Sequence, residues 1–142
     1  MITEITKSVE GTIDFGKKIG SKLKGGDIIA YKGGLGAGKT TLTRGIAQGL
    51  GLPDEVFSPT FSLVNEYRGN ITLYHFDMYR ILNEEALETT GFYDYISESS
   101  VIVIEWSENI SEFLPDNTIK INIDRIDEDT RIITVDGDER FC

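Results

Sequence analysis

Residues 33–40 read Gly-Gly-Leu-Gly-Ala-Gly-Lys-Thr and match in full the phosphate-loop pattern G-x-x-x-x-G-K-[ST]. The glycines allow backbone N–H groups to approach phosphate oxygens closely, because no Cβ stands in the way. Lys39 supplies a positive charge for the β- and γ-phosphates, and the hydroxyl of Thr40 can bind Mg²⁺. The pattern predicts a binding site for nucleotide phosphates.

The segments on either side of the loop have the character that a phosphate loop requires. Residues 27–31 form a short apolar stretch that predicts a strand. Residues 40–50 predict a helix, with one apolar face made of Leu42, Ile46, Ala47 and Leu50. The N-terminus of that helix adds the positive end of its dipole to the site. A flexible glycine turn, the alternative interpretation, would not need these flanks.

Two carboxylates follow apolar runs elsewhere in the chain. Glu105 follows the β-branched run at residues 101–104, and Asp77 follows residues 73–76. Hydrolysis of a nucleotide needs a further group that holds the metal or orients water, and a carboxylate after a neighbouring strand is the usual choice. An acidic residue can also mark only the point where a strand meets solvent. Two such residues beside a phosphate loop favour the functional interpretation.

Three further side chains are candidates for less direct roles. His75 alternates with aromatic neighbours on a predicted strand, which favours a packed and hydrogen-bonded imidazole over a catalytic one. Arg80 could meet either a phosphate or a structural carboxylate, and the sequence does not separate the two. Trp106 is expected to form a wall of the site or a contact with a partner.

The remaining segments predict the elements that must position these residues. Residues 2–5 predict a short edge strand, and Ser8 can cap a helix that ends at Gly25-Gly26. The apolar positions of this helix are Val9, Ile13, Gly16, Ile19 and Leu23.

The second half of the chain predicts mostly strands. Residues 60–67 and 71–77 predict an antiparallel hairpin, and residues 83–88 predict a short helix. The run at 101–104 predicts a strand buried on both faces. Residues 118–124 and 131–135 predict a C-terminal antiparallel strand pair.

Together these elements predict the α/β class and a single P-loop NTPase-like domain over residues 1–142. Its sheet is expected to be mixed, partly parallel, and flanked by helices. The ligand should bind at the carboxyl ends of the strands.

Composition limits the classes of partner. The chain of 142 residues has a formal net charge of −10, which disfavours autonomous binding of nucleic acid, although acidity can also serve only solubility. No apolar run approaches the roughly 18–20 residues of a membrane span. No export signal is visible, and the lone Cys142 cannot form an internal disulfide, so we expect a cytoplasmic protein.

Two absent motifs narrow the nucleotide chemistry. The chain lacks Asn-Lys-x-Asp, the signature with which GTPases read guanine, so adenine is the better base. It also lacks an arginine-rich segment that could close as a lid over two substrates. This second absence argues against a small-molecule kinase.

The sequence resembles the TsaE family, also called YjeE, the small ATPases of bacterial threonylcarbamoyl-adenosine tRNA modification. The resemblance is carried by blocks at residues 33–41, 58–64, 74–80 and 103–106, together with Ser8, Thr12 and Arg131. These blocks occur in the family's order and spacing and cover nearly the whole chain. Two positions depart from the family pattern: Gly34, where Asp or Asn is usual, and Ser107, where Pro is common.

The resemblance implies a site for ATP and Mg²⁺. The residues implied to contact the nucleotide are Ser8, Thr12, Gly33, Leu35, Gly36, Ala37, Gly38, Lys39, Thr40, Thr41 and Arg131. Ser8, Thr12 and Arg131 would lie near the base, and residues 58–64 would form a switch-like loop beside the γ-phosphate. Asp77 and Glu105 correspond to essential carboxylates, with Thr40 and Glu105 expected at the metal and Lys39, Asp77 and Glu105 expected to act in catalysis.

The resemblance also implies a function. Family members work with the TsaB–TsaD pair, so we expect a slow ATPase that resets this complex between turnovers and meets tRNA only through it. A nucleotide-gated adaptor, whose hydrolysis is incidental, is the main alternative.

Overall fold

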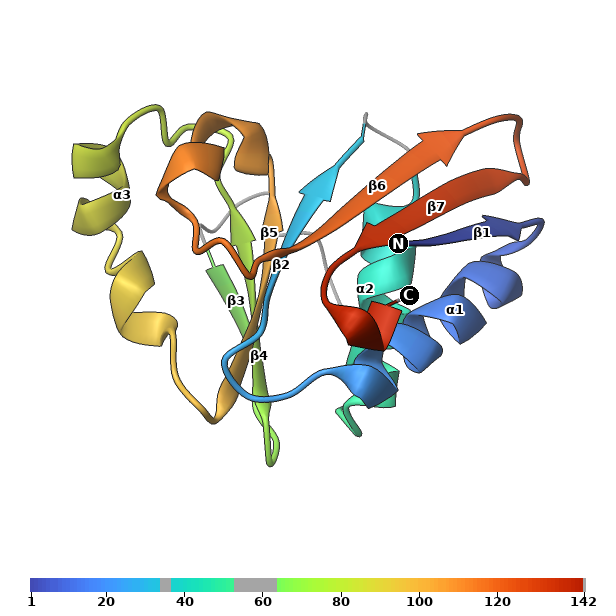
Figure 1. Cartoon of the computed structure of the whole chain (residues 1–142), viewed down its shortest axis with the longest axis horizontal. Helices are drawn as coiled ribbons and strands as arrows, with labels where there is room; N and C mark the ends of the chain where they lie inside the picture. Colours follow the sequence, from blue (N-terminus) through green and yellow to red (C-terminus); the bar gives the residue numbers. More distant parts are fainter. Residues whose placement is uncertain (34–36, 53–63, 142) are drawn as a thin grey trace.

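The computed structural model describes residues 1–33, 37–52 and 64–141. Its seven strands form one sheet in the order β1-β7-β6-β2-β5-β4-β3 (Figure 1). The strands are β1 (Ile2–Thr6), β2 (Ile28–Lys32), β3 (Val64–Tyr67), β4 (Thr72–Asp77), β5 (Ser100–Glu105), β6 (Ile119–Arg125) and β7 (Arg131–Asp136). The helices are α1 (Val9–Lys22), α2 (Lys39–Gly49) and α3 (Glu84–Thr89), with 3₁₀ turns at η1 (Phe92–Tyr95), η2 (Ser107–Asn109), η3 (Ser111–Phe113) and η4 (Glu139–Phe141).

The sheet is mixed, as the sequence predicts. Strand β2 pairs in parallel with β5 and β6, and β4 pairs in parallel with β5. The β3–β4 hairpin and the β6–β7 pair are antiparallel, and β1 forms an antiparallel edge against β7. Since parallel strands end at a common edge of a sheet, the carboxyl ends of β2, β4 and β5 lie together.

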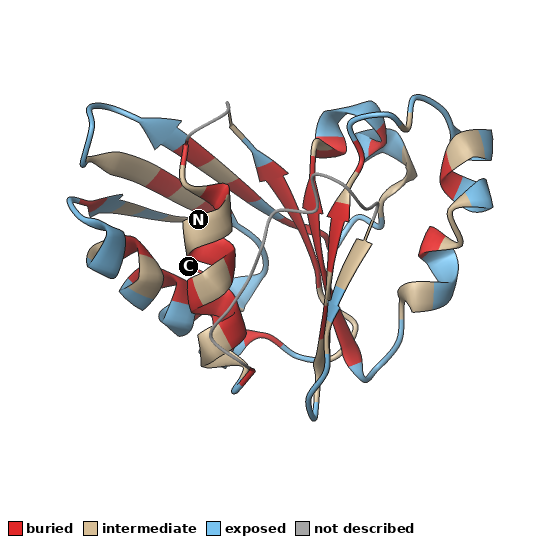
Figure 2. Cartoon of the chain, turned by 180° about the vertical axis from the view of Figure 1, so that it is seen from behind, coloured by how far each residue is buried: buried red, intermediate tan, exposed pale blue. Residues whose placement is uncertain are grey.

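The two faces of the sheet carry separate cores. Helices α1 and α2 cover one face, where Leu73, Val101 and Val103 pack with residues of α2. Helix α3 and the neighbouring 3₁₀ turns cover the other face, where Phe76 and Ile104 are buried. Every residue of β5 is buried, which confirms the prediction of a strand covered on both sides (Figure 2).

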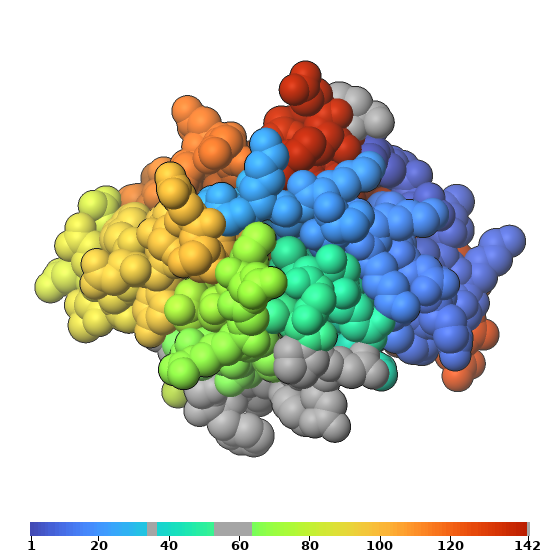
Figure 3. All heavy atoms as spheres, turned by 90° about the horizontal axis from the view of Figure 1, so that it is seen from below, coloured from blue at the N-terminus to red at the C-terminus, as the bar shows by residue number. Residues whose placement is uncertain are grey.

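Helices α1 and α2 touch through their backbones at four glycines. A Cβ on Gly16 would lie 2.6 Å from the carbonyl oxygen of Leu42, and one on Gly45 would lie 2.3 Å from that of Ile13. Gly20 and Gly49 are equally close to the facing helix. In the view from below, α2 lies between α1 and the β3–β4 hairpin (Figure 3). The start of α2, which continues the phosphate loop, is therefore held by a rigid neighbour.

Helix α1 differs from its prediction in two ways. Ser8 is the N-cap, as expected, but the helix ends at Lys22 and not at Gly25-Gly26. The helix ends because Leu23 is extended, and Gly25 then packs against the backbone of Glu98, where a Cβ would clash with the carbonyl oxygen. Val9 was expected on the apolar face but is 58 % exposed, and the largest buried side chain of the helix is Phe15.

The C-terminal segment is fastened by one arginine. The guanidinium of Arg140 donates two hydrogen bonds to the carboxylate of Asp27, at 2.8 and 3.0 Å, and a third to the carbonyl of Lys22. It also donates to Asp138. Such two-pronged pairs are the stronger kind of charged hydrogen bond, so η4 is tied to the connection between α1 and β2.

Candidate functional site

Two glycines of the phosphate loop have backbone conformations that other residues rarely adopt. Gly33 has a φ of 145°, and a Cβ there would lie 2.5 Å from the carbonyl oxygen of Ile123. Gly38 has a φ of 103° and is the N-cap of α2, so this helix begins without a capping side chain. Ala37, Lys39, Thr40 and Thr41 follow in the expected order at the start of α2, whereas Gly34, Leu35 and Gly36 lie outside the described residues.

Lys39 lies at the centre of the site. Its side chain is only 7 % exposed, and Nζ donates to the carbonyl oxygen of Gly33 at 3.2 Å. The same nitrogen lies 4.0 Å from Oε1 of Glu105 and 5.1 Å from the centre of the Trp106 ring. Lys39 therefore lies between the loop, a carboxylate and an aromatic ring.

The two predicted carboxylates come together. Asp77 and Glu105 are register partners on the parallel strands β4 and β5, so both lie at the carboxyl edge and on the sheet face that α2 covers. Glu105 is buried, whereas Asp77 is half-buried and its Oδ1 accepts the N–H of Tyr79 at 2.9 Å. One carboxylate is thus held among polar groups, and the other lies closer to solvent.

His75 makes a contact that the sequence interpretation missed. Its burial is confirmed, because the imidazole is fully buried two residues before Asp77 on the same face of β4. Nε2 lies 2.7 Å from Oε2 of Glu105. The spacing of residues 75 and 77 on one strand indicates that His75 and Asp77 share a face of the sheet. The register of β4 against β5 was needed to place His75 beside Glu105.

A chain of buried hydroxyl groups supports the first turn of α2. The hydroxyl groups of Tyr31 and Thr43 lie 2.8 Å apart, and Oγ1 of Thr43 donates to the carbonyl of Lys39 at 2.8 Å. Burial raises the pKa of Tyr31 far above its ordinary value, so its hydroxyl stays protonated. Ser107, at a position where proline is common in the TsaE family, donates to the carbonyl of Tyr31 at 2.9 Å.

The residues expected near the base gather around a small pocket. A cavity of about 60 Å³ is lined by Ser8, Val9, Thr12, Gly38, Thr41, Glu128, Asp129 and Arg131. Arg131 donates to the carbonyl of Ala37 at 3.0 Å, which links β7 to the phosphate loop. The hydroxyl of Thr12 is buried against that of Thr6 at 2.7 Å, and Ser8 accepts the N–H of Gly11. These two side chains shape the wall, and their polar atoms are already used within the protein.

An aromatic surface lies on the other side of Lys39. The rings of Tyr79 and Trp106 meet edge to face, with their centres 4.9 Å apart. With Arg80, Leu82 and Asn109 they line an open hollow of about 480 Å³. Arg80 is exposed there, which leaves both predicted roles open.

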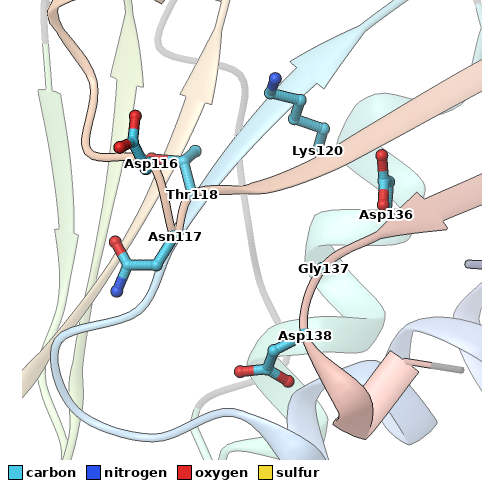
Figure 4. A pocket seen from close by; sticks show the side chains of 7 residues that line it. All are labelled: Asp116, Asn117, Thr118, Lys120, Asp136, Gly137 and Asp138. Carbon is cyan, nitrogen blue, oxygen red and sulfur yellow. The ribbon is translucent and has the colours of Figure 1, made fainter.

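A second hollow, of about 270 Å³, lies at the opposite edge of the sheet. Figure 4 shows Asp116, Asn117 and Thr118 before β6 and Asp136, Gly137 and Asp138 at and after the end of β7, with Lys120 extending from β6. Because β6 runs parallel to β2, this hollow is at the amino end of β6 and far from the phosphate loop. It brings none of the predicted site residues together.

The arrangement suits a metal that is shared with a ligand. Within residues 1–33, 37–52 and 64–141, no cluster of three or more His, Cys, Asp or Glu side chains could hold a metal ion alone. Mg²⁺ is commonly bound through one or two carboxylates and the phosphates of a substrate, and it keeps several waters. A hydroxyl and a carboxylate such as those of Thr40 and Glu105 are groups that could share a metal with the phosphates of a bound nucleotide.

Nothing in the described helices resembles a membrane span: none has both the length and the apolar character to cross a bilayer.

Comparison with known proteins identifies a consistent set of relatives. The family model described as "Threonylcarbamoyl adenosine biosynthesis protein TsaE" matches residues 6–133. A Treponema pallidum protein named tRNA threonylcarbamoyladenosine biosynthesis protein TsaE is 37 % identical over 131 residues, covering 92 % of this chain and 97 % of its own. A Bacillus subtilis protein with the same name is 41 % identical over 130 residues, covering 91 % of this chain and 81 % of its own.

The fold has a counterpart among solved structures. The crystal structure of Bacillus subtilis YdiB superposes with a TM-score of 0.80 at 34 % sequence identity. The match covers 99 % of this chain and 88 % of that one. The fold of this chain is thus shared with a protein whose structure has been solved experimentally.

Proposed function

The chain belongs to the TsaE family, and from this premise we propose that it binds and hydrolyses ATP in the synthesis of N6-threonylcarbamoyladenosine at position 37 of tRNA. In this proposal it acts with the TsaB–TsaD pair, and ATP hydrolysis resets that complex between turnovers. The net charge of −10 supports contact with tRNA only through the complex.

One observation carries the ATPase proposal. The ammonium of Lys39 lies between the phosphate loop, at 3.2 Å from the Gly33 carbonyl, and Oε1 of Glu105, at 4.0 Å. A bound triphosphate would place its β- and γ-phosphates where this ammonium can meet them. The site therefore has a cation for the phosphates and a carboxylate for a metal within a few ångströms.

Each residue then has a separate task. Lys39 binds the phosphates, while Thr40 and Glu105 would hold Mg²⁺ directly or through water. When bound, Mg²⁺ would neutralise the charge that develops on the phosphate oxygens. Asp77, closer to solvent than Glu105, would orient the attacking water or support the shell of the metal.

The site supports slow hydrolysis by the isolated protein. Arginine fingers stabilise the charge of the transition state and raise turnover by about 10³–10⁵. Arg131 is the arginine that contacts the described part of the loop, but its guanidinium donates to the carbonyls of Ala37, Asp127, Glu128 and Thr130. A partner protein would have to supply the missing charge or rearrange the loop.

The test is ATP turnover with and without the purified TsaB–TsaD pair. We expect low activity alone and a clear increase with the pair. Lys39→Ala should abolish nucleotide binding or turnover, whereas Lys120→Ala, an exposed lysine at the opposite edge of the sheet, should change neither. Full activity alone with no increase from the pair would overturn the proposal. Transfer of a labelled γ-phosphate to an acceptor other than water would point instead to a kinase.

The aromatic surface gives some support to the adaptor alternative. Because Trp106 touches both Lys39 and the exposed Tyr79, occupancy of the loop could change a docking surface without hydrolysis. A variant that binds ATP but cannot hydrolyse it distinguishes the two functions. If Glu105→Gln retains ATP binding and restores tRNA modification in cells that lack the protein, the adaptor is correct.

A further inference from the structure

The buried imidazole of His75 is polar in a place where an apolar side chain would pack at lower cost. It is fully buried on β4, and Nδ1 has no hydrogen-bond partner among the described residues. A buried polar group without a partner costs free energy of folding. What distinguishes position 75 from the apolar positions around it is its contact with the side chain of Glu105.

The two oxygens of the Glu105 carboxylate face different groups. Oε2 lies 2.7 Å from Nε2 of His75, and Oε1 lies 4.0 Å from Nζ of Lys39. With Oε2 turned toward the core of the sheet, Oε1 is left on the side of the phosphate loop. His75 thus faces one oxygen of the carboxylate, and Lys39 faces the other.

We propose that His75 is a positioning residue, whose Nε2–H holds Oε2 of Glu105 so that Oε1 faces the place where a nucleotide-bound Mg²⁺ would lie. This inference rests on the proposed function and assigns a role to a residue outside the predicted site. Groups that orient a metal ligand from behind change metal affinity or activity by about 10–100-fold when they are removed.

The present contact is short but not aligned as a hydrogen bond. Neither Nε2 of His75 nor Oε2 of Glu105 meets the angular requirement, although the two atoms are 2.7 Å apart. Hydrogen bonds of active sites are often poorly aligned without a ligand and tighten when it binds. We therefore expect the contact between His75 and Glu105 to tighten when a nucleotide and Mg²⁺ bind.

The first test measures the affinity of a non-hydrolysable ATP analogue by calorimetry, with Mg²⁺ and with EDTA. In His75→Leu, we expect the affinity in EDTA to be unchanged and the gain from Mg²⁺ to fall by about 10–100-fold. His75→Gln should recover much of the gain, because its amide nitrogen can be placed where Nε2 of the imidazole lies. Recovery by glutamine is not expected if His75 only fills space.

Phe76→Leu is the matched control. Phe76 is the next residue of β4, but it points to the other face of the sheet and packs against the ring of Phe92 at 5.3 Å. This variant loses core packing without touching Glu105, so it should be less stable and keep the full gain from Mg²⁺. A loss of the gain in Phe76→Leu would show that general destabilisation, and not His75, controls the metal, which would overturn the inference.

A second test reads the imidazole directly. Because the chain has one histidine, its ring nitrogens give a single set of signals in ¹H–¹⁵N spectra. We expect Nε2 to carry a proton, and a bare Nε2 would overturn the proposal. If the wild-type protein gains no affinity from Mg²⁺, the proposed function fails as well. If the wild type gains affinity and His75→Leu gains as much, only the positioning role fails.

Discussion

Asp77 and Glu105 stand side by side in register at the carboxyl ends of two parallel strands, yet their surroundings differ. Glu105 is buried between His75 and Lys39, whereas Asp77 is half-buried and accepts the backbone N–H of Tyr79. This difference suits the two separate tasks that we propose, with Glu105 as a fixed metal ligand and Asp77 as a group that can reach water. It leads to distinct expectations for their variants.

Glu105→Gln should lower ATP turnover and the gain in ATP affinity from Mg²⁺, but not the ATP affinity measured in EDTA. The amide keeps the shape of the side chain but loses the charge that would support Mg²⁺, so we expect a loss of about 100-fold or more in turnover. Steady-state kinetics and calorimetry measure the two effects separately. Glu108→Gln, at an exposed position in η2, serves as the control. A loss of ATP affinity in EDTA as large as the loss of turnover would contradict the assignment of Glu105 to the metal.

Asp77→Asn should leave the fold intact and slow the chemical step. The amide oxygen can still accept the N–H of Tyr79, so the turn after β4 is kept. If Asp77 orients the attacking water, single-turnover hydrolysis should fall by about 10²–10⁴. A rate that falls only at low Mg²⁺ and recovers at high Mg²⁺ would instead assign Asp77 to the shell of the metal.

Gly16→Ala should destabilise the protein through a backbone clash. The new Cβ would lie 2.6 Å from the carbonyl of Leu42, so α1 and α2 must move apart. Overpacking of this kind costs about 1–3 kcal/mol, and urea unfolding measures it. Gly11→Ala in the same helix is the control, because its nearest neighbour is the adjustable Oγ of Ser8 at 3.3 Å. Equal effects of the two substitutions would show that helix propensity, and not the clash, decides the outcome.

Thr43→Val should cost more stability than Tyr31→Phe. Without the hydroxyl of Tyr31, Thr43 still donates to the carbonyl of Lys39. The protein then loses only the hydrogen bond between Tyr31 and Thr43, worth about 1 kcal/mol. Removing the hydroxyl of Thr43 leaves the buried hydroxyl of Tyr31 without its partner, at about 1–3 kcal/mol for a buried unpaired group, while the carbonyl of Lys39 lies within α2, where a carbonyl also accepts a backbone N–H. Chemical denaturation of both variants measures the order, and the reverse order would exclude this chain of hydrogen bonds.

Asp138 should contribute to stability in a defined pH range. Hydrogen bonds from Arg140 lower the pKa of Asp138 from 3.8 to about 2 in the folded protein. Because the folded pKa lies below the unfolded one, the contribution is complete above about pH 4 and is lost as the pH falls toward 2. The melting temperatures of the wild type and Asp138→Asn should therefore differ at pH 6 and converge in acid. Asp116→Asn serves as the control, because Asp116 is exposed and lines the same surface hollow as Asp138. Its melting temperature should not approach that of the wild type as the pH falls.

Local patterns predicted most of the elements. The strand before the phosphate loop, the helix after it and the β3–β4 hairpin were predicted from apolar spacing and turn residues, and each was confirmed in the described residues. The pairing of β6 with β7 was predicted in the same way. These features depend on residues close together in the sequence, and so a periodicity is sufficient to find them.

Features that depend on long-range register were not predicted. The contact of His75 with Glu105 requires that β4 and β5 run in parallel with residue 77 opposite residue 105. The apolar face of α1 was partly wrong, because Val9 is exposed and Phe15 is buried in its place, whereas Gly16, Ile19 and Leu23 are buried as predicted. The expected roles of Leu35 and Gly36 and of residues 58–63 lie outside the described residues, and the nucleotide contacts of the other site residues remain predictions.

The position of Trp106 makes the intrinsic tryptophan fluorescence of the protein a probe of the phosphate loop. The chain contains one tryptophan, and its ring lies 5.1 Å from the ammonium of Lys39 and against the ring of Tyr79. All indole fluorescence therefore originates beside the phosphate loop, with no background from elsewhere in the chain. Nucleotide that draws Lys39 away from the indole should change the emission, so ligand arrival can be timed in a stopped-flow instrument without any label.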